Sequence, residues 1–426
     1  MALAPNVSST SQGEEGGNID APELRLFVMA LFFIFGGITS LNDVIIPKLK
    51  ELFTLNYMQA MLVQTAFFAA YAIIGLPGAA VVKKIGYMRG AVVGLGLMTL
   101  GCLMFIPASQ SAAFPVFLLA LFVLASGVVI VQVVTNPLIS LLGPAKTAHS
   151  RLTFAQAFNS LGTVIFPIVG SALILGSLAH VSAKELAGPA LDAYRVAETQ
   201  TVVRTYIGLA IALAVVAGVV WMNRNRLKGE KHTEGSLFAG FALLSRPRFA
   251  FGAACIFLYV GAEVSVGSFI VNYLQSPTVL GITAEAAGAF IPYYWGGALA
   301  GRFAGSAILR LANPGVVLGL AAAGAIALLG ISANSGGTLA AYSFLAIGLM
   351  NSIMFPTIFS LACEGLGDKM ADGSGVINVA IVGGAIIPPL TGGLADATSL
   401  TLALALPAAC YAAIAAFGFY SRRSAA

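Results

Sequence analysis

Long apolar stretches alternate with short polar ones along almost the whole of this 426-residue chain. A helix needs about 20 mostly apolar residues to cross the hydrocarbon core of a bilayer. Twelve stretches reach that length, near residues 24–50, 56–82, 88–107, 113–142, 150–178, 199–222, 249–275, 283–309, 314–333, 338–363, 371–395 and 399–420. The pattern predicts an all-α membrane protein with twelve transmembrane helices.

Composition favours the same class. Hydrophobic residues make up 58% of the chain and charged residues only 9%, whereas a soluble domain carries roughly 25% charged residues. The mean hydropathy is +0.92. Lipid is therefore the expected solvent, and the bilayer is an expected partner. The four cysteines, at positions 102, 255, 363 and 410, fall in apolar stretches and are interpreted as small packing residues.

The cationic residues are unevenly divided between the two sides that twelve spans would create. Seventeen of the 22 Lys and Arg fall on the side of the N-terminus, and five fall on the other side. Cytoplasmic loops of membrane proteins carry an excess of these residues. We therefore predict that both termini are cytoplasmic in a bacterial inner membrane, and that the positive charge is a topology signal and not a nucleic-acid-binding surface.

The chain reads as two similar halves. Residues 66–97 and 293–320 share an aromatic cluster, a run of small residues, a basic turn and a helix rich in Gly and Val. Two six-helix halves with internal repeats are the arrangement of the Major Facilitator Superfamily. The predicted parts are a disordered cytoplasmic tail (1–23), an N-terminal bundle (24–222), a cytoplasmic linker (223–248), a C-terminal bundle (249–420) and a second tail (421–426).

Two acidic residues stand out within the apolar stretches, on the first and seventh spans, which are equivalent in the two halves. Asp43 ends the first predicted span and Glu263 lies in the seventh. An ionised group inside the membrane is costly and normally faces a cavity or a partner, so both are candidates for binding a coupling cation. Two alternatives stay open: Asp43, with Lys48 and Lys50 close behind it, ends in water, and Glu263 makes a structural hydrogen bond.

Amide side chains form the second polar set within the spans. Each amide offers donors and an acceptor together, which suits a sugar because its hydroxyls both donate and accept. Trp295, with Tyr293 and Tyr294 beside it, could stack on a sugar face. For any one amide, a hydrogen bond between helices is the alternative. The candidate sugar-binding residues are Gln64, Gln132, Asn136, Gln156, Asn159, Asn272, Trp295, Asn351 and Asn378.

Several function classes lack their signatures. The chain has no GxxxxGK[ST] loop for ATP, no arginine ladder for voltage sensing, and no HExxH or GxSxG motif for hydrolysis. We therefore expect a transporter and not an enzyme, with no cofactor beyond a coupling ion.

Six segments resemble the fucose:proton symporter family of the Major Facilitator Superfamily. They are residues 41–71, 134–144, 150–163, 259–274, 295–306 and 348–367. The resemblance implies uptake of a monosaccharide into a bacterium with a cation. It assigns proton coupling to Asp43, but it places Gln132 where the family has a second acid. Gln132 and Glu263 look like the glucose/galactose transporter branch. Sodium occurs among its relatives, so Na⁺ at Asp43 is an alternative to H⁺.

The predicted function is thus a monomeric symporter that imports glucose, galactose or a related hexose by alternating access, with H⁺ or Na⁺. Lys83, Lys84 and Arg302, the last near the cytoplasmic end of the eighth span, are predicted to close the cytoplasmic gate. An uncoupled sugar facilitator is the main alternative, and a drug or metabolite exporter of the same fold is a weaker one.

Overall fold

A computed structural model describes residues 24–54, 57–111, 113–174, 188–225, 227 and 239–422. The predicted tail at 1–23 lies outside the described residues, as do much of the predicted linker and the last four residues of the chain.

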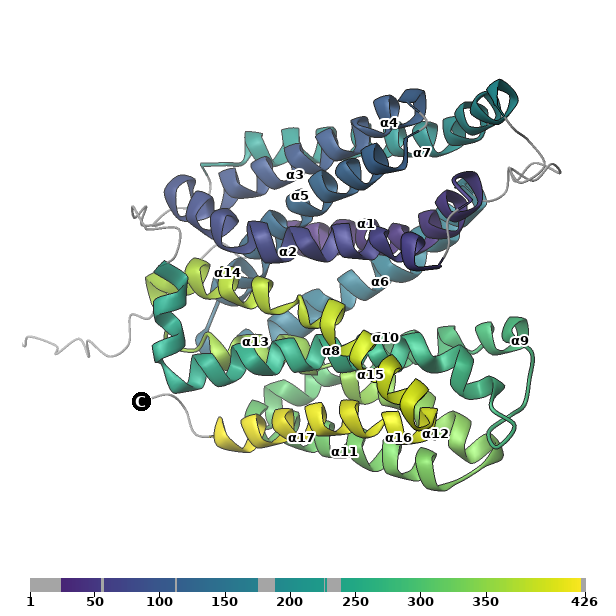
Figure 1. The fold of residues 1–426 in the computed structure, drawn as a ribbon. Helices are drawn as coiled ribbons and strands as arrows, with labels where there is room; N and C mark the ends of the chain where they lie inside the picture. Colours follow the sequence, from purple (N-terminus) through teal and green to yellow (C-terminus); the bar gives the residue numbers. More distant parts are fainter. Residues whose placement is uncertain are drawn as a thin grey trace, which may run out of the picture.

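Seven α-helices form the first half of the described chain (Figure 1). They are α1 (Leu24–Leu52), α2 (Tyr57–Ile85), α3 (Tyr87–Leu103), α4 (Phe105–Ser111), α5 (Phe114–Leu141), α6 (Ala148–Ile174) and α7 (Pro189–Met222). Helix α1 packs along α6, and α5 packs between α2 and α3. Helix α7 lies against α3 on the outside of this group.

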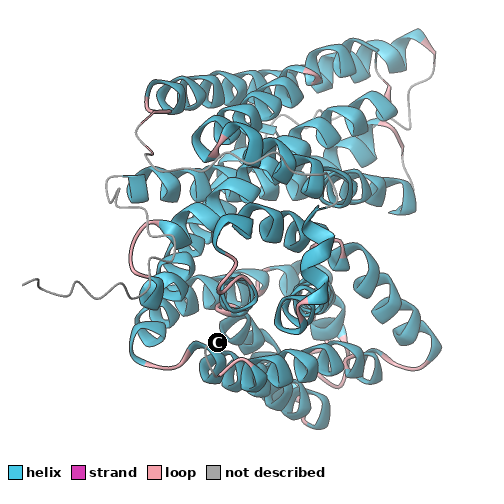
Figure 2. Cartoon of the chain, turned by 90° about the vertical axis from the view of Figure 1, so that its left-hand side faces the viewer, coloured by secondary structure: helices cyan, strands magenta, loops and turns pink. Residues whose placement is uncertain are grey.

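Ten α-helices, several of them short, form the second half. They are α8 (Pro247–Gln275), α9 (Ala284–Gly288), α10 (Ile291–Leu311), α11 (Pro314–Asn334), α12 (Gly337–Asn351), α13 (Met354–Ala362), α14 (Met370–Ala380), α15 (Gly383–Ala397), α16 (Leu400–Ala403) and α17 (Ala405–Tyr420). Among the residues that the structure describes, three 3₁₀ helices also occur, at Ala145–Thr147, Ala239–Ser245 and Gly367–Lys369. The described residues contain helices and loops but no strand (Figure 2).

The all-α prediction is confirmed, and most of the helices begin and end close to the predicted spans. Eleven helical segments in the described residues are long and apolar enough to cross a membrane. The twelfth is α10, whose 21 residues extend about 32 Å at 1.5 Å per residue. Large apolar side chains on the outside are exposed, such as Leu311, Ile168 and Ile211, as expected for a surface that faces lipid.

The eighth span differs from the prediction. Residues 283–309 were expected to be one helix, but α9 ends at Gly288 and α10 begins at Ile291. Pro292 stands at the start of α10, where the absence of an N–H costs nothing. Four of the twelve membrane crossings are likewise built from two helices, α3 with α4, α12 with α13, α14 with α15, and α16 with α17.

The two halves meet towards one end of the molecule, which we call the basic end; it carries Lys83, Arg151, Arg248, Arg310 and Lys369. Helix α14 contacts α2, and α10 and α13 contact α6. Towards the opposite end, which we call the far end, the ribbons of the two halves diverge (Figure 1). The described C-terminal residues lie at the basic end.

Candidate functional site

Three of the predicted sugar-binding amides lie close together in the first half. Gln132 and Asn136 are one helical turn apart on α5, and both are buried. The Gln132 Nε2 donates to the hydroxyl of Tyr71 on α2 at 2.8 Å, and the Gln156 Nε2 on α6 lies 3.4 Å from the Asn136 Oδ1. The side chains therefore form one polar row across α2, α5 and α6.

Asn159 extends this row to α1. Its Nδ2 lies 3.4 Å from the Phe32 carbonyl oxygen, and a Cβ atom on Gly36 would overlap the Asn159 amide. Glycine at position 36 thus lets α6 place this amide directly against α1. Asp43 lies further along α1, but its side chain is outside the described residues, so its coupling role, with H⁺ or Na⁺, stays a prediction.

A second polar cluster surrounds Glu263 on α8. The Tyr259 hydroxyl, one turn earlier, lies 2.7 Å from the Glu263 Oε1 and 3.1 Å from the carbonyl oxygen of Asn351. The Asn351 Nδ2 donates to the Tyr294 hydroxyl on α10 at 2.8 Å. A single O–H on Tyr259 can donate to only one of its two neighbours at a time. Whether the Glu263 carboxyl group is ionised or protonated therefore decides which of the two acceptors receives the Tyr259 hydrogen bond.

The break between α12 and α13 supplies backbone acceptors to this cluster. Pro356 has no N–H, so it cannot bond to the carbonyl of Ser352 four residues earlier. That carbonyl instead accepts from the Arg302 Nε at 3.2 Å. The Asn351 carbonyl, at the end of α12, faces Tyr259. At this break, two backbone carbonyl oxygens are therefore free to accept hydrogen bonds from the side chains of Tyr259 and Arg302.

Arg302 joins the two halves. It lies mid-helix in α10, nine residues before the end at Leu311, and so deeper than the predicted place near the cytoplasmic end. Its Nη1 donates to the Gln156 carbonyl oxygen at 3.1 Å and also to the Ser160 hydroxyl. It is also close enough to Glu263 for electrostatic attraction. One guanidinium therefore contacts the amide row and lies near the acidic cluster.

Further polar contacts between the halves lie at the basic end. The Lys83 Nζ and the Asp372 Oδ2 form an ion pair at 2.7 Å, with side chains 12% and 8% exposed. The Ser150 hydroxyl donates to the Ser306 carbonyl oxygen at 2.6 Å. Lys84 is exposed and makes no hydrogen bond or ion pair with the described residues. Of the two predicted gate lysines, only Lys83 reaches the other half.

The other predicted site residues are more scattered. Gln64 is half-buried on α2. Asn378 is fully buried on α14, where its Nδ2 donates to the Ser374 carbonyl oxygen at 2.8 Å, while its Oδ1 accepts no hydrogen bond from the described residues. Asn272 is exposed towards the far end of α8, and Trp295 is 40% exposed. The structure does not bring Asn272 to either cluster.

Sequence reasoning missed several partners of these residues. Tyr259 could have been found, because a residue four positions before Glu263 shares its helix face. Tyr71, Ser160 and Asp372 gave no comparable signal, since each meets its partner through the packing of helices distant in sequence.

Comparisons with known proteins agree with this architecture. A family model described as Major Facilitator Superfamily matches residues 28–389. The chain is 48% identical to a glucose/galactose transporter of Brucella abortus, over 92% of this chain and 93% of that protein. It is 31% identical to the L-fucose-proton symporter of Escherichia coli, over 99% of both chains.

A solved structure is also similar. The crystal structure of the transporter FucP in the outward conformation superposes with a TM-score of 0.86 at 31% sequence identity, covering 94% of this chain and 99% of that one. The similarity to FucP covers both six-helix halves.

Proposed function

This chain belongs to the Major Facilitator Superfamily, a family of transporters, and from that premise we propose that it is a proton-coupled symporter that imports a monosaccharide of the glucose or galactose type. The observation that carries the proposal is the pair of buried polar clusters, the Gln132–Asn136–Gln156 row in one half and the Tyr259–Glu263–Asn351 group in the other. The names of its glucose/galactose relatives support the choice of hexose.

The amide row fits a neutral polyhydroxyl substrate. A buried amide left without partners is costly. The Gln156 and Asn159 amides make only long hydrogen bonds of 3.4 Å, whereas Gln132 bonds to the Tyr71 hydroxyl at 2.8 Å. A sugar that offers donors and acceptors would replace such bonds at little cost. We assign Gln132, Asn136, Gln156 and Asn159 to sugar binding. Asn351 and Asn378 are weaker candidates from the second half, and Gln64, Asn272 and Trp295 weaker still.

Alternating access follows from how the halves touch. The ion pair of Lys83 with Asp372 and the bonds of Arg302 to Gln156 and Ser160 hold the basic end closed, and the similar FucP structure is in the outward conformation. Transport inward requires these contacts to break while the far end closes. We propose that the basic end is cytoplasmic, in a bacterial inner membrane, and that a single chain carries the cycle.

Coupling is assigned to Asp43 and Glu263, with H⁺ as the ion. An ionised Glu263 accepts from the Tyr259 hydroxyl. Once Glu263 is protonated, its own O–H donates to the Tyr259 oxygen, and Tyr259 then donates to the Asn351 carbonyl oxygen instead. Proton binding thus changes a hydrogen bond at the α12–α13 break, where Arg302 is also held. Such a link would let protonation alter the contacts between the halves.

Uptake by purified protein in liposomes tests the proposal. Radiolabelled glucose and galactose should accumulate when the outside is acidified, and a protonophore should abolish accumulation. Asp43→Asn should remove accumulation while leaving exchange of internal for external sugar. Accumulation driven by a Na⁺ gradient at equal pH on both sides would instead identify Na⁺ as the coupling ion.

The same assay separates the rival functions. Equilibration without accumulation under either gradient would identify an uncoupled facilitator. Binding of apolar drugs with no binding of any monosaccharide would identify an exporter.

A further inference from the structure

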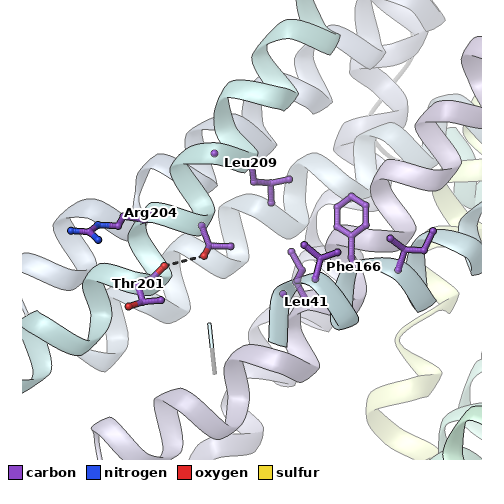
Figure 3. Close-up of a pocket in the computed structure, with 10 residues that line it drawn as sticks. Leu41, Phe166, Thr201, Arg204 and Leu209 are labelled. Carbon is purple, nitrogen blue, oxygen red and sulfur yellow. Dashed lines mark hydrogen bonds between the residues drawn. The ribbon is translucent and has the colours of Figure 1, made fainter. Parts of the chain in front are cut away.

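An apolar crevice lies on the outside of the first half, between α1, α6 and α7. Its volume is about 520 Å³, within the roughly 300–1,000 Å³ typical of ligand pockets. Leu41, Phe166, Val169 and Leu209 line it with apolar side chains (Figure 3). Helix α6 packs on α1 while α7 packs on α3, and glycine at position 208 leaves the space between them unfilled.

The crevice opens onto the lipid-facing surface. Val169 is 51% exposed at its edge, and its neighbours Ile168 and Ile211 are 65% and 62% exposed. Side chains of this kind on the outside of a transmembrane bundle contact acyl chains. A hydrocarbon chain is therefore the natural occupant of the crevice.

Arg204 marks the level of the lipid phosphates. Trp221 and Met222, both exposed, end α7 just before Asn223 and Arg224, which places one membrane interface there because Trp concentrates at that level. Arg204 lies 18 residues earlier on α7, about 27 Å along the helix axis. The hydrocarbon core is about 30 Å thick, so Arg204 lies at the opposite interface.

Arg204 also differs from the other described cations at the far end. Lys48 is buried and paired with Glu198 at 2.5 Å. The Arg195 Nε donates to the Leu52 carbonyl oxygen, and its guanidinium lies over the Phe53 ring. Arg204 is exposed and makes no hydrogen bond or ion pair with the described part of the chain. Its side chain extends from α7 away from Phe166 (Figure 3).

We propose that this crevice binds one anionic phospholipid from the leaflet at the far end. One acyl chain lies in the crevice against Phe166 and Leu209, and the phosphate contacts the Arg204 guanidinium. The Thr205 hydroxyl, on the same wall, is already used within the helix, where it donates to the Thr201 carbonyl oxygen at 3.0 Å. Headgroup selection therefore rests on Arg204, and the crevice itself selects only a hydrocarbon chain.

Native mass spectrometry of the full chain in detergent tests this, with phosphatidylglycerol and phosphatidylcholine of the same acyl chains as probes. The wild type should retain one phosphatidylglycerol in preference to phosphatidylcholine. A single Arg near an anionic headgroup accounts for about a fivefold preference, so Arg204→Gln should reduce the preference to about one. Gly208→Leu should fill the crevice and weaken retention of both lipids.

Two matched variants control for charge and for helix packing. Arg89→Gln removes an exposed Arg at the basic end. Gly218→Leu adds the same side chain to α7 outside the crevice; a Cβ at Gly208 or at Gly218 meets no atom within 4 Å, so the two sites are matched in the space around the backbone. Both controls should retain lipid as the wild type does. Equal retention of the two lipids by the wild type, or an unchanged preference in Arg204→Gln, would overturn the proposal.

Discussion

The ion pair between Lys83 and Asp372 offers a direct test of how the closed basic end is held. It joins α2 to α14, across the two halves, and its side chains are 12% and 8% exposed. Replacing Lys83 by Met leaves the Asp372 carboxylate without its cation inside a closed contact. Opening of the basic end would expose that carboxylate to water, so the substitution should favour the open form.

The size of the shift follows from the burial of the pair. A surface ion pair contributes about 0–1 kcal/mol, whereas removing one partner of a fully buried pair costs about 3–5 kcal/mol. With both side chains nearly but not fully buried, we expect about 2 kcal/mol. That corresponds to a roughly 30-fold change in the ratio of open to closed forms.

Spin labels on the two halves would measure this ratio. Arg89 and Leu311 are exposed at the basic end on opposite halves, and the four native cysteines are free and buried. In the double variant Arg89→Cys and Leu311→Cys, double electron–electron resonance should give a single distance between the labels, that of the closed form. When Lys83→Met is added, a second, longer distance from the open form should appear.

The neighbouring lysine supplies the control. Lys84→Met removes an exposed charge that has no partner among the described residues, and it should leave the distances unchanged. The charge swap Lys83→Asp with Asp372→Lys should restore most of the closed form. If Lys83→Met and Lys84→Met gave the same distance distributions, or if the swap gave no recovery, the ion pair would not be what holds this end closed.

Three further predictions follow from the packing and from the acidic cluster. Tyr259→Phe removes a hydrogen bond to a charged group, which contributes about 1.5–3 kcal/mol, so pH-driven sugar accumulation should fall about tenfold or more while sugar exchange persists. Gly162→Ala places a methyl group against the backbone of α1 and should cost about 1–3 kcal/mol; thermal unfolding in detergent should show a lower Tm, whereas Gly96→Ala, which meets no atom within 4 Å, should not lower it. Pro356→Ala restores an N–H that competes with Arg302 for a carbonyl oxygen, and initial uptake rates should fall several-fold.

The number and order of the membrane crossings could be predicted because hydrophobicity over 20 residues is a strong physical signal. The breaks inside crossings could not, since hydropathy does not distinguish one helix from two. Pro292 and Pro356 were visible in the sequence, yet proline marks an end, a kink or a break alike. Which of these occurs depends on what packs against the freed carbonyl, and that partner lies elsewhere in the chain.

In the candidate site, too, local sequence predicts some of the contacts, and the others depend on packing between distant segments. Gln132 and Asn136 are four residues apart on one helix, so their common face follows from helical geometry alone. Asn272 was a weaker candidate by composition, and it lies exposed towards the far end of α8. The contact between Lys83 and Asp372 spans 289 residues of sequence, and no local pattern in a single sequence reports such a pairing.

Arg302 connects the candidate sugar-binding residues to the contacts between the two halves. Its guanidinium bonds to the Gln156 backbone, while the Gln156 side chain faces Asn136. A sugar that draws the Gln156 amide away from Asn136 would also shift the turn of α6 whose carbonyl oxygen accepts from Arg302. Because Arg302 is also attracted to Glu263, neutralising that carboxylate would change the same contact from the other half. The sugar and the proton would then both change the strength of the contact that Arg302 makes with α6. Coupling requires that both ligands alter one such shared equilibrium.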